Sequence, residues 1–112
     1  MKTTNLITAP LKDTPHKVDV KQMYDHPDTQ VMHMTLKPGE SLKPHKTHVD
    51  VFFYVLEGAP TVHIGDEAIA YPKDTLVESP KDIVHYISNE SNEIARILVV
   101  KTSSSQTSTK VL

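Results

Sequence analysis

Residues 38–58 read PGESLKPHKTHVDVFFYVLEG, and this stretch decides the fold of the chain. It begins with a proline–glycine turn signal, passes two histidines and an acid, and runs into aromatic and β-branched residues that favour a strand. A second stretch, residues 74–89, reads DTLVESPKDIVHYISN and carries Pro80, His85 and Asn89 at fixed offsets. Together these two stretches indicate both the fold and the candidate site of the chain.

The composition places the chain among small proteins of one domain. With 112 residues it can bury a core without disulfides. It has no cysteine, so any metal must bind His, Asp, Glu or backbone oxygen. The net charge of −2 indicates no basic face, and we expect no nucleic-acid partner. Because no segment approaches the roughly 20 apolar residues needed to span a membrane, we expect a cytoplasmic protein without membrane contact.

Short strand patterns separated by turns recur along the chain, and no stretch shows convincing helical periodicity. The alternation in residues 30–36 places Met32, Met34 and Leu36 on one face. Glycine and aspartate at 65–66 predict a hairpin turn. Further strands are expected at residues 5–8, 18–24, 51–56, 61–64, 67–71, 75–78, 84–88 and 94–101. This pattern predicts an all-β sandwich or barrel.

The chain divides into three expected regions. Residues 1–29 hold N-terminal strands and an arm, residues 30–101 the barrel, and residues 102–112 a polar tail rich in Ser and Thr with nothing to bury. Residues 51–56 are apolar on both faces, which is typical of a strand that is covered on both sides. We therefore hypothesise that a second subunit or a terminal segment covers the outer face, and we expect a homodimer.

The two stretches resemble the two sequence motifs of the cupin family. The matching positions are Gly39, His45 and Gly58 in the first motif and Pro80, His85 and Asn89 in the second. The resemblance covers residues 30–101 and implies a jelly-roll β-barrel, also called a double-stranded β-helix. Asp74 and Asp82 stand where the family has glycine. Aspartate tolerates left-handed turns better than most residues, so we expect the fold to survive both changes.

The resemblance also implies a metal site. In the family, two histidines and a glutamate of the first motif and the histidine of the second surround one divalent ion inside the barrel. His45 and His85 match two of these ligands, and Zn, Fe, Mn or Ni is the implied cofactor. Thr47 and Val51 occupy the positions of the second histidine and the glutamate, so half of the ligand set is missing.

His48 is the neighbour that could replace a lost ligand. A regular strand would turn His48 and Asp50 away from the metal, whereas a bulge before Val51 could bring one of them inward. We therefore include His48 with His45 and His85 in the predicted metal set. The alternative is that His48 is a solvated turn residue, and Asp50 is expected to bond the local backbone.

Other side chains are assigned by their position on the predicted strands. The residues expected to line the pocket are Thr47, Val51, Phe53 and Val55. His33 and His63 lie on other strands, and the sequence leaves open which face each takes. His16 and His26 have polar, turn-like surroundings and are expected at the surface.

Three functions stay open at this point. A metal-dependent enzyme or binder would use the incomplete ligand set to leave positions for water or substrate, and the resemblance allows dioxygenase, isomerase or decarboxylase chemistry. The alternative is a metal-free module that binds a sugar-like or apolar small molecule without catalysis. A third possibility uses His45 or His85 as a general base, without an evident acid partner.

Overall fold

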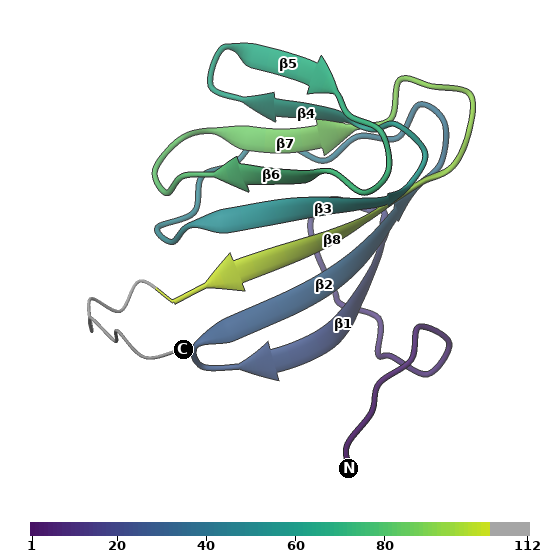
Figure 1. Cartoon of the computed structure of the whole chain (residues 1–112), viewed down its shortest axis with the longest axis vertical. Helices are drawn as coiled ribbons and strands as arrows, with labels where there is room; N and C mark the ends of the chain where they lie inside the picture. Colours follow the sequence, from purple (N-terminus) through teal and green to yellow (C-terminus); the bar gives the residue numbers. More distant parts are fainter. Residues whose placement is uncertain (104–112) are drawn as a thin grey trace.

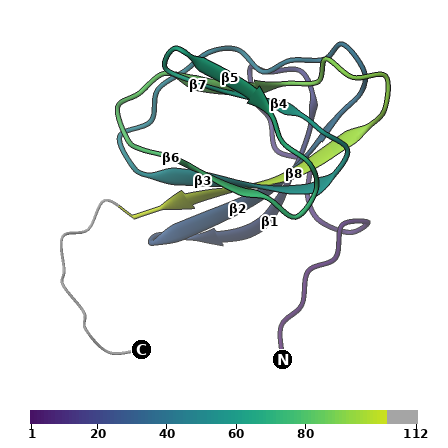
Figure 2. The same cartoon turned by 45° about the horizontal axis from the view of Figure 1, so that its top comes forward.

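The computed structural model describes residues 1–103, which form eight β-strands in two antiparallel sheets. The strands are β1 (Asp19–His26), β2 (Thr29–Leu36), β3 (Val51–Glu57), β4 (Thr61–Ile64), β5 (Glu67–Ala70), β6 (Leu76–Ser79), β7 (His85–Ser88) and β8 (Ala95–Thr102). One sheet has the order β1-β2-β8-β3-β6 and the other the order β5-β4-β7. Figure 1 gives the course of the chain, and Figure 2 shows the two sheets facing each other as two layers. The described residues include no helix that could cross a membrane.

The inner faces of the two sheets form one hydrophobic core. Met32, Met34 and Leu36 of β2 point inward with 3, 6 and 0% exposure, as the alternation predicts. Val62 and Ile87 pair across β4 and β7 and meet them from the other sheet. Full burial of an aliphatic side chain stabilises the fold by about 1.5–3 kcal/mol. The all-β prediction is confirmed.

One predicted strand is wrong. Residues 5–8 form a turn, in which Ala9 N donates to Asn5 O at 3.0 Å and Thr8 N donates to Asn5 Oδ1 at 3.0 Å. The Asn5 side chain thus offers the backbone a partner that a strand ladder would otherwise supply. β1 runs on to His26 because it pairs with β2 to the hairpin. The other predicted strands are present, and the part of the predicted tail from residue 104 onward lies outside the described residues.

Several turns have a left-handed backbone, among them those at Asp74, Asp82 and Gly58. Asp74 and Asp82 have φ angles of 67° and 64°, so aspartate takes the conformation for which the family uses glycine, as expected. Gly58 has a φ of 76°, and a Cβ at this position would lie 2.5 Å from the carbonyl oxygen of Ile94. The end of β3 therefore needs glycine for both conformation and space.

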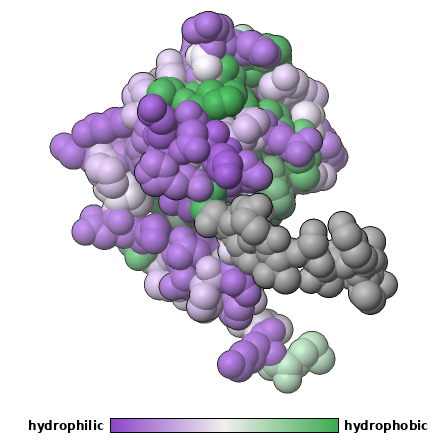
Figure 3. All heavy atoms as spheres, turned by 90° about the vertical axis from the view of Figure 1, so that its left-hand side faces the viewer, coloured by the Kyte–Doolittle hydropathy of each residue, from purple (hydrophilic) through white to green (hydrophobic). Residues whose placement is uncertain are grey.

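The outer face of β3 is apolar and only partly covered. Phe52, Tyr54 and Leu56 are half-buried, and Leu76, which pairs with Tyr54, is 49% exposed. The expectation that a second subunit covers this face stays a prediction. On the side of the molecule that Figure 3 shows, hydrophobic surface gathers in the upper part, and the surface below it is mainly hydrophilic.

Candidate functional site

His45 and His85 meet inside the barrel although they are 40 positions apart in the chain. The segment before β3 pairs with the first residue of β7: His45 N donates to His85 O at 3.1 Å, and His85 N donates to His45 O at 2.9 Å. This bridge brings the two Nε2 atoms to 3.2 Å, with the rings at 88° to each other. His85 is 1% exposed, and His45 is half-buried.

A chain of hydrogen bonds fixes the orientation of both rings. Nδ1 of His45 lies 3.0 Å from the carbonyl oxygen of Lys43, so this nitrogen carries the hydrogen. With the hydrogen on Nδ1, Nε2 of the His45 ring is an acceptor, and Nε2–H of His85 donates to it. Nδ1 of His85 in turn accepts from the Ser79 hydroxyl at 2.6 Å. The network therefore assigns one tautomer to each ring.

The histidine pair opens onto a cavity of about 180 Å³. Most of the wall is hydrophobic: Val20, Met32, Met34, Leu42, Val51 and Val99. Phe53 completes it and meets the ring of His85 at 5.5 Å between centroids and 84° between planes. Val51 and Phe53 thus lie where the sequence places them. A hydrophobic wall with a few convergent polar groups is typical of small-molecule sites.

The remaining side of the cavity is polar and comes from both ends of the described chain. Lys12, Asp13 and His16 belong to the segment before β1, and Lys101 lies near the end of β8. The segment is held in place by the bond from Lys12 N to Val20 O at 2.8 Å. Residues far apart in sequence therefore form one charged side of the site.

His16, expected at the surface, is half-buried and lines the cavity. Its ring lies 5.0 Å from the ring of His45 between centroids, and its Nδ1 accepts the backbone N–H of Lys43 at 2.9 Å. The turn-like sequence around His16 gives no sign that this turn folds back against the barrel.

Burial governs the protonation of this site. It lowers the pKa of His85 to about 4, with a further contribution from positive charge at His45 and Lys101. Burial also lowers the pKa of His16, followed by the effect of the same neighbours and Lys43. The pKa of Lys101 is lowered by burial and then by the ammonium group of Lys12. His85 and His16 are consequently neutral at pH 7.

The inclusion of His48 in the ligand set is corrected by its position. Its side chain is 94% exposed, and Nδ1 contacts Asp82 Oδ1 at 2.9 Å. His48 does not line the cavity that His45 and His85 share. The backbone before β3 gives no inward turn at this residue, so the alternative of a solvated turn residue describes it.

Two expected lining residues also lie elsewhere. Thr47 donates from Oγ1 to the carbonyl oxygen of Val49 at 2.9 Å, a local bond that turns the hydroxyl to the backbone. Val55 is 0% exposed and belongs to the core, beyond the cavity wall. The side chains of Val51, Phe53 and Val55 share the inward face of β3 as predicted, but the cavity does not extend along the strand as far as Val55.

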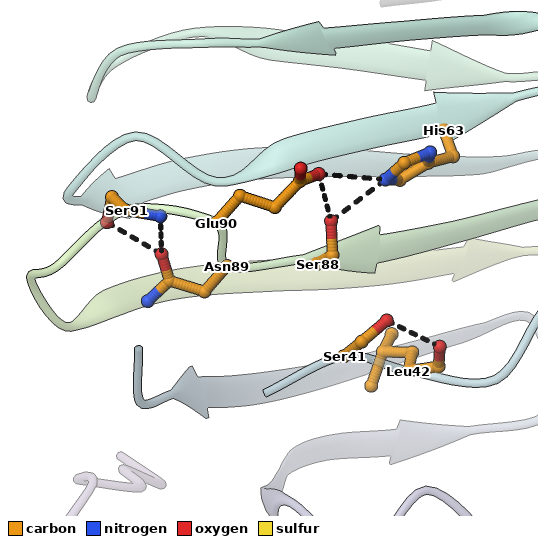
Figure 4. A network of polar contacts seen from close by, with 7 residues as sticks. All are labelled: Ser41, Leu42, His63, Ser88, Asn89, Glu90 and Ser91. Carbon is orange, nitrogen blue, oxygen red and sulfur yellow. Dashed lines mark hydrogen bonds and ion pairs between the residues drawn. The ribbon is translucent and has the colours of Figure 1, made fainter. Parts of the chain in front are cut away.

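Neither of the two undecided histidines lines the cavity. His33 lies on the face of β2 opposite the inward methionines, is 3% exposed, and accepts from Arg96 Nη1 at 3.0 Å. His63 lies on the outer face of β4, where Nε2 contacts Ser88 Oγ at 2.8 Å and Glu90 Oε2 at 3.6 Å (Figure 4).

Sequence reasoning missed Ser79 and Lys101, although a signal for both exists. Ser79 falls two residues after the half-buried Val77 and directly before the proline of the second motif, so strand alternation turns it inward. Lys101 follows Ile97 and Val99 at a spacing of two, on the buried face of β8. A lysine at the end of an inward-facing series indicates a charged group near a cavity.

The comparisons with known proteins agree with this architecture. Residues 32–101 match the cupin domain family. The chain is a cupin. Because the match spans both histidines and all strands from β2 to β8 in whole or part, the jelly-roll prediction is confirmed. No curated protein matches the sequence of this cupin.

Several solved structures are similar to this cupin over most of their length. TT1209 from Thermus thermophilus shares 25% identity at a TM-score of 0.79, covering 92% of this chain and 98% of that one. The polyketide cyclase RemF from Streptomyces resistomycificus shares 17% identity at a TM-score of 0.80, and the match covers 91% of this chain and 79% of that one. A predicted oxalate decarboxylase from Thermotoga maritima shares 21% identity at a TM-score of 0.72, and the match covers 77% of this chain and 80% of that one. Relatives of such varied description carry the fold and not one function.

The described residues of this cupin do not complete a metal site. Within residues 1–103, no group of three or more His, Cys, Asp or Glu side chains could hold an ion. Val51 supplies hydrocarbon to the cavity where the family has glutamate. Lys12 and Lys101 bring positive charge to the same cavity, which disfavours a cation. The two imidazoles therefore remain without a third ligand.

Proposed function

We propose that this cupin binds a small organic molecule in the barrel cavity, without a resident metal. The observation that carries the proposal is the pairing of His45 and His85 over a cavity that is otherwise mainly hydrophobic. Apolar walls supply affinity by removing hydrocarbon from water, and a few fixed polar groups orient the bound molecule.

The tautomers define what the histidine pair offers to a bound molecule. Nε2–H of His85 is a donor, and Nε2 of His45 is an acceptor. At present each satisfies the other, so a molecule that carries both a donor and an acceptor can enter between them without leaving a buried polar group unpaired. Ser79 and the carbonyl of Lys43 keep the rings in position during this exchange.

The test combines elemental analysis with binding. Protein purified without a nickel column and treated with chelator is screened by thermal shift and calorimetry against small cyclic acids, amides and alcohols. We expect metal below about a tenth of an equivalent, the level of adventitious binding at a partial site. We also expect binding that survives chelation and is lost in His45→Ala and His85→Ala. One equivalent of metal, with binding lost on chelation, would contradict the proposal.

A second candidate is a metal-dependent site on the same two histidines. The Nε2 atoms are 3.2 Å apart, which is close to the separation of two imidazole nitrogens at about 2.0–2.1 Å from one zinc ion. Such an ion would supply Lewis-acid chemistry, with His45 and His85 holding it. Retention of one equivalent of metal in the wild type and its loss in both alanine variants would favour this candidate.

We further propose that the protein is a homodimer that buries the outer face of β3. Phe52, Tyr54 and Leu56 are half-buried there and form an apolar surface next to Leu76. Light scattering after size exclusion should give twice the mass of the chain, and Phe52→Lys should shift it to one chain. A strict monomer of the wild type at micromolar concentration would overturn this proposal.

A further inference from the structure

The charged side of the cavity is unbalanced. Lys12, Lys101 and Asp13 line it together with the imidazole rings of His16, His45 and His85. Apart from the histidines, two lysines and one aspartate leave one net positive charge on the lining. The strands that form the hydrophobic side add no carboxylate to the lining of the cavity.

The two lysines have no acidic partner in the described part of the chain. The ion pairs of residues 1–103 involve His26, His48, His63 and Arg96, and none of them includes a lysine. Lys12 Nζ donates only to the amide oxygen of Gln22, at 3.3 Å. Lys101 is half-buried and is repelled by Lys12. A half-buried ammonium without a counter-charge destabilises the fold, and a bound anion would remove this penalty.

We propose that the molecule bound in the cavity is a small monocarboxylate with an apolar body, whose carboxylate lies beside Lys101 and Lys12. This inference rests on the proposed function and adds its ligand class. The carboxylate would balance the single positive charge of the lining. Oxygen atoms of the carboxylate can also accept from Nε2–H of His16, since Nδ1 of that ring is already an acceptor.

The cavity sets the size of this molecule. Its volume is about 180 Å³, and a cavity of about 150 Å³ holds benzene. The apolar body is therefore about one six-membered ring, placed against Phe53 and the methionines of β2. A phosphate ester with the same body would bring a larger group and a second negative charge, which the lining does not balance. Benzoate is a suitable probe, with benzamide and benzyl alcohol as neutral molecules of similar shape.

The experiment measures calorimetric binding of these three probes to the full chain after treatment with chelator. We expect benzoate to bind at least about tenfold more tightly than benzamide or benzyl alcohol, with an affinity that falls as salt is raised. Lys101→Gln should abolish this preference, and Lys12→Gln should reduce it. Lys73→Gln, in an exposed turn before β6, is the matched control and should leave the preference unchanged.

A second readout separates loss of binding from loss of folding. Without any probe, Lys101→Gln should melt at the same or a higher temperature than the wild type, because it removes an uncompensated charge. Benzoate should raise the melting temperature of the wild type and not that of the variant. A variant that melts well below the wild type would contradict the unbalanced-charge argument.

The outcomes also separate this inference from the proposed function. If benzamide or benzyl alcohol binds as tightly as benzoate, and His85→Ala abolishes that binding, the cavity is a binding site but the carboxylate preference is overturned. If none of the three probes binds, and the broader screen of acids, amides and alcohols also gives no binding, both proposals fail.

Discussion

Two histidine–serine pairs within residues 1–103 lie in very different surroundings. His85 and Ser79 lie inside the barrel, with Nδ1 and Oγ 2.6 Å apart, and His63 and Ser88 lie on its outer face, with Nε2 and Oγ 2.8 Å apart. The inner pair is almost inaccessible, with 1% exposure of each residue. The same two side-chain types thus occur on opposite sides of one small barrel.

The outer pair is closed by an acid, and the inner pair is not. Ser88 donates to Glu90 Oε2 at 2.9 Å (Figure 4). The ring of His63 stacks on that of Tyr86, with 4.0 Å between the centroids. The inner pair instead continues through His45 to a cavity whose lining carries positive charge. The outer network therefore satisfies its own polar groups, whereas the inner network borders a cavity with positive charge in its lining, where another molecule can bind.

The largest expected effect comes from giving the inner pair an acid. Val51→Glu introduces a carboxylate at the cavity position where the family has glutamate. Structural zinc sites with four ligands gain about 10–16 kcal/mol, so a third ligand should add roughly 3–4 kcal/mol, or at least a hundredfold in zinc affinity. Calorimetric titration with zinc checks this, and Val51→Gln is the matched control. Equal zinc affinity of the wild type and Val51→Glu would mean that the side chain at 51 does not reach the histidines.

A somewhat smaller effect concerns acid stability. The pKa of His85 is about 4 in the folded protein because of burial and then nearby positive charge, against about 6.5 when unfolded. Between these values the unfolded chain binds the extra proton, so stability is complete above pH 6.5 and falls as the pH drops toward 4. Protonation of His85 should lower the free energy of unfolding by about 3 kcal/mol over this pH range.

Urea unfolding at a series of pH values checks the acid-stability prediction. His85→Gln should lack this part of the pH dependence, whereas His26→Gln, at an exposed position, should keep it. If the wild type and His85→Gln lose stability in parallel, His85 is not the residue responsible.

The smallest effect compares the two serines directly. Ser79→Ala leaves a buried nitrogen of His85 without its donor, which should destabilise the fold by about 1–3 kcal/mol. Ser88→Ala should cost less than about 1 kcal/mol, because Glu90 lies 3.6 Å from the same nitrogen of His63 and water can reach it. Thermal unfolding of the two variants side by side measures the difference. If Ser88→Ala lost more stability than Ser79→Ala, the hydrogen bond of the outer pair would matter more to the fold than that of the inner pair, which would contradict this prediction.

Alternation and spacing predicted most of the fold. The inward side chains of β2 and β3 follow from period two, and the left-handed turns at Asp74 and Asp82 follow from motif positions that normally hold glycine. The strand predicted at residues 5–8 failed because a single asparagine side chain caps a local turn, which short-range hydrophobicity does not report.

The candidate site was predicted in part. The meeting of His45 and His85 follows from two motifs in register, but the addition of His48 assumed an irregular backbone that the structure does not have. The polar side formed by His16 and Lys101 could not be found from either motif, because it depends on how the chain before β1 folds against the last strand. Such long-range packing leaves only weak signals in a single sequence.

The position of the segment before β1 has a practical consequence for anyone trimming this protein. The part shared with the cupin domain begins at residue 32, whereas Lys12 and His16 form a wall of the cavity. A version cut at that boundary would keep the histidine pair. It would lose three charged or ionisable residues of the cavity lining, Lys12, Asp13 and His16, and it would remove β1, which now pairs with β2. Part of the polar side of the cavity therefore lies outside the residues that the cupin domain family matches.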